Sequence, residues 1–342
     1  MAGDPARPQQ SPAEPAPPLV VGVDAGGTRT RAVLAAAADG RVLGEGAAGP
    51  GNALTVPLPL LTAHLAEAVA RAVPEAARGR VVAVAGGFAG ATGTAEDEPG
   101  HVNARTALKD ALRRIGVPAG PIVVGSDIEA AFASAPGTPA DGLALVAGTG
   151  AVAMRIAGRR RTATVDGDGW LLGDDGSGFW IGRQAVRAAL RMADGRGGAT
   201  VLAQAVGQAL GLPAEVLPGG ALGWSRDGRE GYRMHLLPVV MAEPPTRLAR
   251  LAPLVAGAAR EKDPVAQAIL DEAADQLTDT VRALGPRAGE RVVATGGLLG
   301  PEGPLTAALT ARLRSLGLTL DGVADGCRGA VALARIEYER RG

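Results

Sequence analysis

A single cysteine, Cys327, is present among the 342 residues, so the chain cannot form an intrachain disulfide, and a lone thiol is typical of a reducing compartment. An excess of charge of one sign is also missing, because 35 basic residues balance 35 acidic ones. Nucleic acids and anionic membranes bind basic patches, so we predict neither as a partner. No apolar run approaches about 18 residues, the length that predicts a transmembrane helix. These absences favour a cytoplasmic protein.

The composition that is present favours a globular protein of two domains. Hydrophobic residues make up 46% of the chain, and its length corresponds to about two domains of roughly 150 residues each. The segment 1–18 is rich in proline and lacks the apolar core of a signal peptide, which predicts a disordered tail. We expect a first domain over 19–136, a second domain with a helical insertion over 137–326, and a C-terminal helix over 327–342 that packs back on the first domain.

The order of the predicted elements repeats once along the chain. In the first half, apolar runs, glycine turns and helical spacing predict strands over 19–24, 28–36, 41–46, 80–85 and 121–124, and helices over 58–73 and 103–115. In the second half they predict strands over 143–146, 151–156, 161–165 and 291–295, and helices over 177–192, 244–259, 265–284, 305–316 and 329–340. Two βββαβα units, each opened by a glycine-rich hairpin, indicate an α/β fold built from a duplicated domain.

The first glycine hairpin, Asp24-Ala25-Gly26-Gly27-Thr28, follows a buried strand. Gly26 and Gly27 tolerate positive φ and can turn consecutive amides outward, an arrangement that binds phosphate, and Thr28 adds a hydroxyl. Asp24 is suited to hold Mg²⁺, through water, because Mg²⁺ keeps several of its waters in proteins. An ordinary Gly-Gly hairpin would explain the same residues, so the motif alone leaves both interpretations open.

The second glycine hairpin, Gly148-Thr149-Gly150, occupies the equivalent position in the second unit. It offers the same kind of amides and hydroxyl. Two such hairpins at equivalent places in a duplicated fold would hold a triphosphate from both sides. The pair is therefore more specific than either hairpin alone and favours a nucleotide site between the two units.

Asp127 stands just past the buried segment Val123-Val124-Gly125-Ser126, at the start of a predicted helix. Either Ser126 or Asp127 can serve as the N-cap of that helix. A carboxylate in this place can also accept the proton of an attacking hydroxyl, as a catalytic aspartate does in phosphoryl transfer. Both interpretations of Asp127 stay open on this motif alone.

The segment 166–180 combines glycines with four carboxylates and two of the three tryptophans. Carboxylates accept hydrogen bonds from hydroxyls and an aromatic face packs on a sugar ring, so the segment suits sugar recognition. A capped helix start, with Asp175 or Ser177 as the N-cap, would also explain it, and Phe179 and Trp180 would then be core residues. The segment 294–300 is similarly either a glycine turn against a flat base or a plain strand-to-helix turn.

These segments, in this order and spacing, resemble the BadF/BadG/BcrA/BcrD ATPase family of the acetate and sugar kinase/Hsp70/actin superfamily, and within it the N-acetylglucosamine kinases. The resemblance covers about 20–340 and is carried by GWLLGDDGSGFWIGRQAV, VGSDIEAAFASA and LVAGTGAVAM. It implies two RNase H-like (actin-like ATPase) βββαβα domains that flank a nucleotide cleft, with a helical insertion in the second.

The resemblance also implies roles for individual residues. Asp127 would be the catalytic base and Asp24 the residue that holds the metal. The sugar would be bound by Asn52, Asp174 and the turn of Gly167, Asp168 and Gly169. The nucleotide would be bound by Gly26, Gly27 and Thr28, by Gly148, Thr149 and Gly150, and, at the adenosine, by Gly296, Gly297 and Leu298. ATP and Mg²⁺ are the implied cofactors, an amino sugar is the implied substrate, and a homodimer is the implied assembly.

The sugar itself stays open. The family usually has Gly-Gly-Trp-Gly where this chain has Asp166-Gly167-Asp168-Gly169, and the added carboxylate of Asp168 suits a free amine, which keeps glucosamine beside N-acetylglucosamine. N-acetylmuramic acid, glucose and N-acetylmannosamine also remain. An activator ATPase of this family would need two cysteines per subunit for its iron–sulfur cluster, and a non-catalytic nucleotide sensor is the other alternative. The run 159–161 of three arginines is interpreted as a solvated basic turn.

Overall fold

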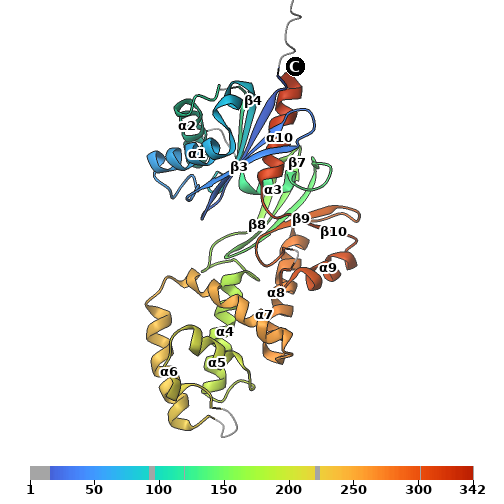
Figure 1. Cartoon of the computed structure of the whole chain (residues 1–342). Coiled ribbons are helices and arrows are strands. Elements are labelled where there is room, and N and C mark those ends of the chain that lie inside the picture. The colour runs from blue at the N-terminus through green and yellow to red at the C-terminus, as the bar shows by residue number, and fades with distance from the viewer. Residues whose placement is uncertain (1–15, 92–96, 119, 220–223, 301, 342) are drawn as a thin grey trace, which may run out of the picture.

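The computed structural model describes residues 16–91, 97–118, 120–219, 224–300 and 302–341. These residues form two five-stranded sheets with helices on their faces (Figure 1). The strand order is β3-β2-β1-β4-β5 in the first sheet and, read in the same sense, β8-β7-β6-β9-β10 in the second. In both sheets three consecutive strands pair antiparallel and two later strands pair parallel. The predicted α/β class with two βββαβα units is therefore confirmed, while most of the predicted tail lies outside the described residues.

The first sheet is built from residues of the N-terminal part. Its strands are β1 (Leu19–Ala25), β2 (Thr30–Ala36), β3 (Val42–Ala48), β4 (Val81–Phe88) and β5 (Ile122–Ser126). On one face it carries α1 (Leu58–Ala72) and α2 (Pro99–Arg114), with the 3₁₀ helix η1 (Glu75–Arg80), and on the other α3 (Asp127–Ala133) and α10 (Cys327–Arg341). Leu61 and Leu65 of α1 are fully buried on the sheet, so apolar burial holds this face together.

The second sheet carries the helical insertion. Its strands are β6 (Gly142–Ala147), β7 (Ala151–Ala157), β8 (Arg160–Asp166), β9 (Arg291–Thr295) and β10 (Thr319–Gly322). Between β8 and β9 lie α4 (Gly178–Ala193), α5 (Leu202–Ala209), η2 (Ala214–Val216), α6 (Arg226–Met241), η3 (Pro245–Leu251), α7 (Ala252–Arg260) and α8 (Pro264–Ala283), and α9 (Thr306–Ser315) precedes β10. Ile181 and Leu277 are fully buried in the core that joins α4 and α8 to the sheet. Figure 1 shows α5 and α6 at the end of the molecule remote from the first sheet.

Helix α3 packs against both sheets. Its Phe132 is fully buried in a cluster with Ile156 of β7 and Val293 of β9, which belong to the second sheet. On its other side α3 contacts α10, and a Cβ at Gly329 would overlap the carbonyl oxygen of Ala130, so only glycine permits this approach. The helix that begins with Asp127 is therefore held between the two halves of the molecule.

Several predicted boundaries are wrong. β2 begins at Thr30, so Thr28 lies in the turn, and the helix predicted over 244–259 is a 3₁₀ helix followed by α7. α5, α6 and β10 were not predicted, because α5 and β10 are short and α6 contains Pro238 and a polar first half. The N-cap alternatives are settled in favour of Ser126, which accepts a hydrogen bond from the Glu129 amide, and Ser177, which accepts one from the Trp180 amide.

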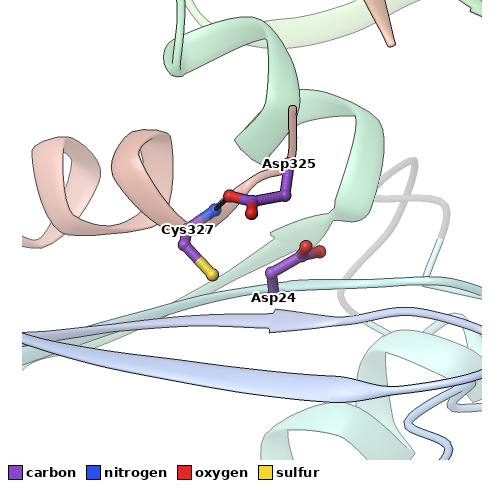
Figure 2. A group of neighbouring side chains, drawn as sticks. All are labelled: Asp24, Asp325 and Cys327. Atoms are coloured by element: carbon purple, nitrogen blue, oxygen red, sulfur yellow. Dashed lines mark hydrogen bonds between the residues drawn. The ribbon is translucent and has the colours of Figure 1, made fainter. Parts of the chain in front are cut away.

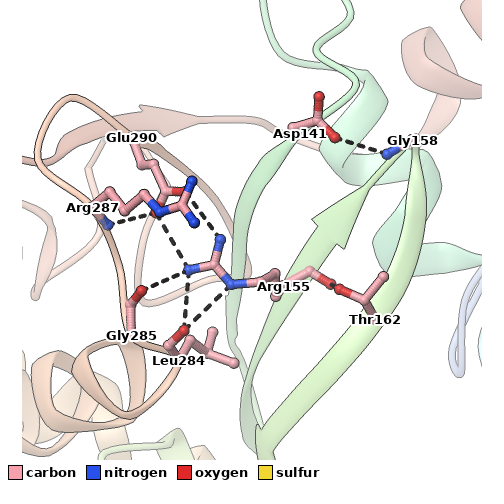
Figure 3. Close-up of polar contacts among 8 residues, drawn as sticks. All are labelled: Asp141, Arg155, Gly158, Thr162, Leu284, Gly285, Arg287 and Glu290. Carbon is pink, nitrogen blue, oxygen red and sulfur yellow. Dashed lines mark hydrogen bonds and ion pairs between the residues drawn. The ribbon is translucent and has the colours of Figure 1, made fainter.

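Arg155 of β7 ties the insertion back to the second sheet (Figure 3). Its guanidinium donates to the carbonyl oxygens of Leu284 and Gly285 and pairs with the Glu290 carboxylate at 3.0 Å. The hydrogen bond from Arg155 lowers the pKa of Glu290, as expected for a carboxylate beside a guanidinium. This network fixes the end of α8 beside the start of β9.

Among the described helices none combines the length and the apolar character needed to cross a membrane.

Candidate functional site

Asp24 and Asp127 lie near each other at the carboxyl end of the first sheet. β1, β4 and β5 run parallel, and their register places Asp24 beside Gly87 and Gly87 beside Gly125. A Cβ at Gly87 would overlap the Ala130 side chain and lie 3.1 Å from the Asp127 Cα, so α3 begins directly over β4. Parallel pairing therefore brings together two carboxylates that are about 100 residues apart in the sequence.

Burial and neighbouring charge make these carboxylates stronger bases than usual. Burial, followed by the negative charge of Asp24, raises the pKa of Asp127 to about 6. Burial also raises the pKa of Asp24, against the opposing hydrogen bond from the Gly326 amide and the opposing charge of Arg31. A carboxylate with a pKa of about 6 is ionised at neutral pH and still accepts a proton more readily than an ordinary aspartate. Asp127 thus has the properties of a general base.

Asp24 is also contacted by the segment that precedes α10, far along the chain (Figure 2). The Gly326 amide donates to Asp24 Oδ2 at 3.3 Å across 302 residues of sequence. Arg31 Nη1 lies 3.1 Å from Asp325 Oδ2 and 3.7 Å from Asp24 Oδ2. The two carboxylates therefore share one guanidinium.

The side chains around Asp24 offer both oxygen and sulfur atoms to a metal ion. Asp24, Asp325 and Cys327 each offer one ligand atom, and these atoms all lie within 4.8 Å of one another. Mg²⁺ prefers hard oxygen ligands, which the two carboxylates supply. Burial raises the pKa of the Cys327 thiol, so it stays protonated, and sulfur is in any case a poor ligand for this ion. The two carboxylates fit Mg²⁺ and the thiol does not.

The two glycine hairpins close differently. The Gly26 amide donates to the Arg29 carbonyl at 3.0 Å, whereas the Gly148 amide donates to the Gly150 carbonyl at 2.9 Å. The first amide of each hairpin is thus engaged within its own turn. Among the described residues, no hydrogen-bond partner is found for the amides of Gly27, Thr28, Thr149 and Gly150. Two adjacent amides in each hairpin therefore remain for an anion.

Open space in front of the glycines is compatible with a nucleotide. A Cβ at Gly27, Gly148 or Gly297 would meet no protein atom within 4 Å. Positive φ occurs at Gly296 but at neither Gly26 nor Gly27, so the first hairpin does not use the freedom of glycine to adopt positive φ. Glycine in the first hairpin leaves room for a ligand; it does not supply an unusual backbone conformation.

The third glycine segment lies against the second hairpin. The Leu298 amide donates to the Ala147 carbonyl at 3.2 Å, and a Cβ at Gly296 would overlap the same carbonyl oxygen. The Leu298 side chain is buried in the core, so the backbone around Gly297 is the part that is open to a ligand. The structure therefore brings two of the three predicted nucleotide segments together at the end of the second sheet.

Asn52 lies beside the first hairpin. The preceding Gly51 donates its amide to the Gly26 carbonyl at 2.9 Å. Asn52 Oδ1 accepts hydrogen bonds from the amides of Leu54 and Thr55, so this oxygen caps a turn. The side-chain nitrogen pairs with no residue in the described part of the chain, so it can donate to a ligand, and its role at a sugar stays a prediction.

The loop after β8 places Asp174 at the second hairpin. Asp166 Oδ1 accepts the Asp174 amide at 2.7 Å, and Asp174 Oδ1 in turn accepts the Ala151 amide at 3.0 Å. Burial raises the pKa of Asp174. Within the described residues, no hydrogen bond connects Asp174 to Asn52 or Asp127, so the structure does not join these three predicted sugar residues directly. The role of Asp174 at a sugar stays a prediction.

The remaining predicted sugar residues lie on an exposed turn. Gly167 and Gly169 both have φ of +82°, and Asp168 between them is exposed. Trp170 is 40% exposed and meets the ring of Phe179 edge-on at 6.1 Å between centroids. Phe179 is buried, as its alternative interpretation as a core residue predicted.

Two surface cavities lie outside this group. One, of about 760 Å³, lies in the helical insertion and is lined by Leu190, Ala193, Asp194, Trp224, Arg226, Arg229, Glu230 and Arg233. The other, of about 500 Å³, borders the first hairpin and is lined by Arg29, Glu45, Gly46, Ala47, Ala48, Gly49, Glu67 and Arg71. Neither cavity is lined by Asp24 or Asp127. The candidate site is therefore located by its carboxylates and open amides and not by a cavity.

Sequence reasoning missed several residues of the site. Glu129 completes a capping box with Ser126, and the pattern Ser-x-x-Glu was visible in the sequence. Asp325, Gly326 and Arg31 reach Asp24 only through folding, and no local pattern marks them.

Comparison with known proteins places the chain among ATPases. A model of the BadF/BadG/BcrA/BcrD ATPase family matches residues 21–331. The N-acetylmuramic acid/N-acetylglucosamine kinase of Clostridium acetobutylicum is 31% identical over 185 residues, which cover 54% of this chain and 57% of that protein. The match thus spans little more than half the length of this curated relative.

Solved structures support the same fold. A structure described as a putative N-acetylglucosamine kinase from Porphyromonas gingivalis superposes with a TM-score of 0.68 at 20% identity, covering 94% of this chain and 99% of that one. A second structure, from Chromobacterium violaceum and described in the same terms, gives a TM-score of 0.62 at 24% identity, covering 94% and 100%. At these identities the likeness establishes the fold.

Proposed function

The chain belongs to the BadF/BadG/BcrA/BcrD ATPase family, and we propose that it is an ATP-dependent kinase for the 6-hydroxyl of an amino sugar, with N-acetylglucosamine as the leading substrate. The observation that carries the proposal is Asp127, a carboxylate with a pKa raised to about 6 at the edge of a sheet, near Asp24. A relative with partial coverage is named as a kinase of N-acetylmuramic acid and N-acetylglucosamine, which supports the choice of sugars.

Asp127 would activate the sugar. Its carboxylate accepts the proton of the 6-hydroxyl while the hydroxyl oxygen attacks the γ-phosphorus, and the bond from that phosphorus to the bridging oxygen breaks as ADP leaves. The Ile128 amide donates to Asp127 Oδ1 at 3.0 Å, which leaves Oδ2 for the proton. Asn52, beside the first hairpin, would donate its side-chain nitrogen to another hydroxyl.

The nucleotide would be held by backbone amides. The open amides of Gly27 and Thr28 in one hairpin and of Thr149 and Gly150 in the other can donate to phosphate oxygens. The space beside Gly297 would accommodate the adenosine. Asp24, with Asp325, would hold a magnesium ion, which when bound neutralises charge on the β- and γ-phosphates. Arg31 then provides the remaining positive charge beside both carboxylates.

The test is ADP release from Mg·ATP with a panel of N-acetylglucosamine, glucosamine, N-acetylmuramic acid, N-acetylmannosamine and glucose. One sugar should stimulate release strongly, and Asp127→Asn should lower that turnover about 100- to 10,000-fold, the range of general base catalysis. Asp141→Asn is the matched control, because this carboxylate lies in the connection between the sheets and, among the described residues, accepts a hydrogen bond from the Gly158 amide alone. No stimulation by any sugar would exclude the kinase proposal. Stimulation that survives Asp127→Asn would exclude Asp127 as the base.

The homodimer implied by the resemblance stays a prediction. Sedimentation of the purified chain over a range of concentrations would test it, because a dimer that dissociates changes its sedimentation coefficient with concentration.

A further inference from the structure

Glu129 is a buried carboxylate in the first turn of α3, and its contacts reach the other half of the molecule. It is 3% exposed. Its Oε2 accepts the amide of Ser126, the residue directly before Asp127, at 3.1 Å. Its Oε1 accepts the amide of Arg161 at 2.9 Å, and Arg161 lies in β8, an edge strand of the second sheet. One side chain thus bridges the turn that carries Asp127 and the opposite sheet.

A guanidinium completes the environment of this carboxylate. Arg160 Nη1 lies 3.6 Å from Glu129 Oε2, and the Arg160 side chain is 55% exposed. Arg159 donates from Nη2 to the Thr138 carbonyl at 3.1 Å in the connection between the sheets. The arginine run is therefore more than the solvated turn that the sequence suggested. A buried carboxylate needs such partners, because an unpaired buried charge is strongly destabilising.

The other end of β8 leads to the second glycine hairpin. β8 ends at Asp166, which holds the amide of Asp174, and Asp174 holds the amide of Ala151 directly after that hairpin. A single strand therefore connects Glu129, at one end, with the loop that supports the second hairpin at the other. β8 is paired with β7 from Arg160 to Asp166, with one irregularity at Thr162, and alternate residues of such an antiparallel strand are hydrogen-bonded to the neighbour.

We propose that Glu129 is a positioning residue that, through β8, sets the place of Asp127 relative to the second glycine hairpin. The inference rests on the proposed function, in which the hydroxyl activated at Asp127 must meet a phosphate held at that hairpin. Glu129 acts through the Ser126 amide and touches no reacting atom. Glu129 would contribute to the rate by keeping Asp127 aligned with the phosphate, since a misplacement of about 1 Å can cost about 100-fold in rate.

The first test uses Arg160→Ala, which removes an exposed side chain and leaves the buried carboxylate in place. With the sugar that the wild type phosphorylates, it should lower kcat about 3- to 10-fold with an unchanged KM for ATP, whereas Arg160→Lys should keep most of the activity. Arg113→Ala, which removes an exposed ion pair with Asp110 on α2, is the matched control and should leave kcat unchanged. A role in stability alone would leave the kcat of the folded Arg160→Ala variant unchanged, because only alignment of the reacting groups changes kcat at constant KM.

Glu129→Gln tests the same contact from the other side. It presents an amide in place of one acceptor oxygen and should lower kcat about 10- to 100-fold, again without a change in the KM for ATP. In the double variant kcat should fall no further than in Glu129→Gln alone, because Arg160 acts through the Glu129 carboxylate. Losses that multiply, or wild-type kcat in Arg160→Ala, would overturn the proposal.

Hydrogen exchange keeps this test separate from the kinase assay. In Arg160→Ala the amides of 127–133 should exchange several-fold faster than in wild type, with no sugar or nucleotide present. If wild type phosphorylates no sugar, the proposed function fails while the exchange result still decides whether Glu129 ties α3 to β8. If turnover is normal in wild type and Arg160→Ala changes neither exchange nor kcat, the role of Glu129 fails alone.

Discussion

The two halves of the molecule share a sheet topology and differ in the acidic residues that stand at the ends of their strands. The strands that flank each hairpin end in two residue pairs that can be compared. The second-to-last pair is Asp24 with Arg31 at the first hairpin and Val146 with Val152 at the second. β5 leads directly into a helix that begins with Asp127, whereas β10 is followed by the segment 323–326 before α10 begins. Both halves thus carry a hairpin with two open amides, whereas Asp24 and Asp127 have no acidic counterpart at the equivalent described positions of the second half.

The hairpins also differ in what holds them. The second hairpin is supported by the first amides of α4, because Gly178 donates to the Gly148 carbonyl at 2.8 Å and Phe179 to the Thr149 carbonyl at 3.0 Å. The first hairpin is supported by amides from two loops, because Gly51 donates to the Gly26 carbonyl at 2.9 Å and Ala89 to the Ala25 carbonyl at 2.9 Å. Both hairpins are therefore held from outside the turn, one by a helix start and the other by loops that follow β3 and β4.

Removing the carboxylate that distinguishes the first half should have the largest effect. Asp24→Asn is expected to lower kcat about 100- to 1000-fold, because it removes a charge that would hold the metal and so weakens stabilisation of the transition state. ADP release measured over a range of Mg²⁺ concentrations tests it. Asp39→Asn, in the exposed turn between β2 and β3, is the control. Wild-type kcat for Asp24→Asn at every Mg²⁺ concentration would show that the acid has no part in the reaction.

Filling the open space at the hairpins should affect the nucleotide. Gly148→Ala and Gly27→Ala place a methyl group where no protein atom lies within 4 Å, so both variants should fold. The KM for ATP should rise about 10- to 100-fold in both variants, because the added methyl group takes space that a phosphate would occupy. Gly257→Ala in α7, also with open space, is the control. Equal KM values in all three variants would contradict nucleotide binding at the hairpins.

The pH dependence of kcat and of stability should reveal the ionisation of Asp127. Because the pKa of Asp127 is about 6, log kcat should rise with a slope of about one below that pH and level off above it. The folded state binds the proton more tightly than the unfolded state, so ionisation of Asp127 lowers stability as the pH rises from the usual carboxyl range through about 6. Asp127→Asn should therefore raise the melting temperature above pH 6 and leave it unchanged near pH 3. A variant that is less stable than wild type at pH 8 would refute this account.

The smallest effect is expected in the scaffold of the second half. Arg155→Ala should lower the free energy of unfolding by about 1 to 2 kcal/mol, because its hydrogen bonds to the Leu284 carbonyl and Glu290 are partly buried. Kinetic constants should stay at the wild-type values. Urea denaturation, with Arg282→Ala in an exposed pair with Asp279 as the control, measures it. Equal losses in both variants would mean that the Arg155 network adds nothing beyond a surface ion pair.

The sequence was sufficient where the structure depends on local pattern. Leu19–Ala25 and Arg291–Thr295 are buried strands flanked by glycine turns, and both were predicted within one residue. The pattern of apolar runs was weaker for Thr319–Gly322, a four-residue edge strand, and for α6, whose first half is polar. Those elements exist because neighbouring strands and helices cover them, which no local pattern states.

The sequence by itself determined the duplicated fold and the placement of Asp24 and Asp127 at strand ends. Buried strands and glycine turns depend on the pattern of residues that are adjacent in the chain, so they can be predicted locally. Only the tertiary structure decided which groups meet there. The Gly326 amide reaches Asp24 across 302 residues, and Glu129 reaches the Arg161 amide in the other sheet. Such contacts depend on how α3 packs between the sheets and α10 packs on the first sheet, and packing is a property of the whole chain.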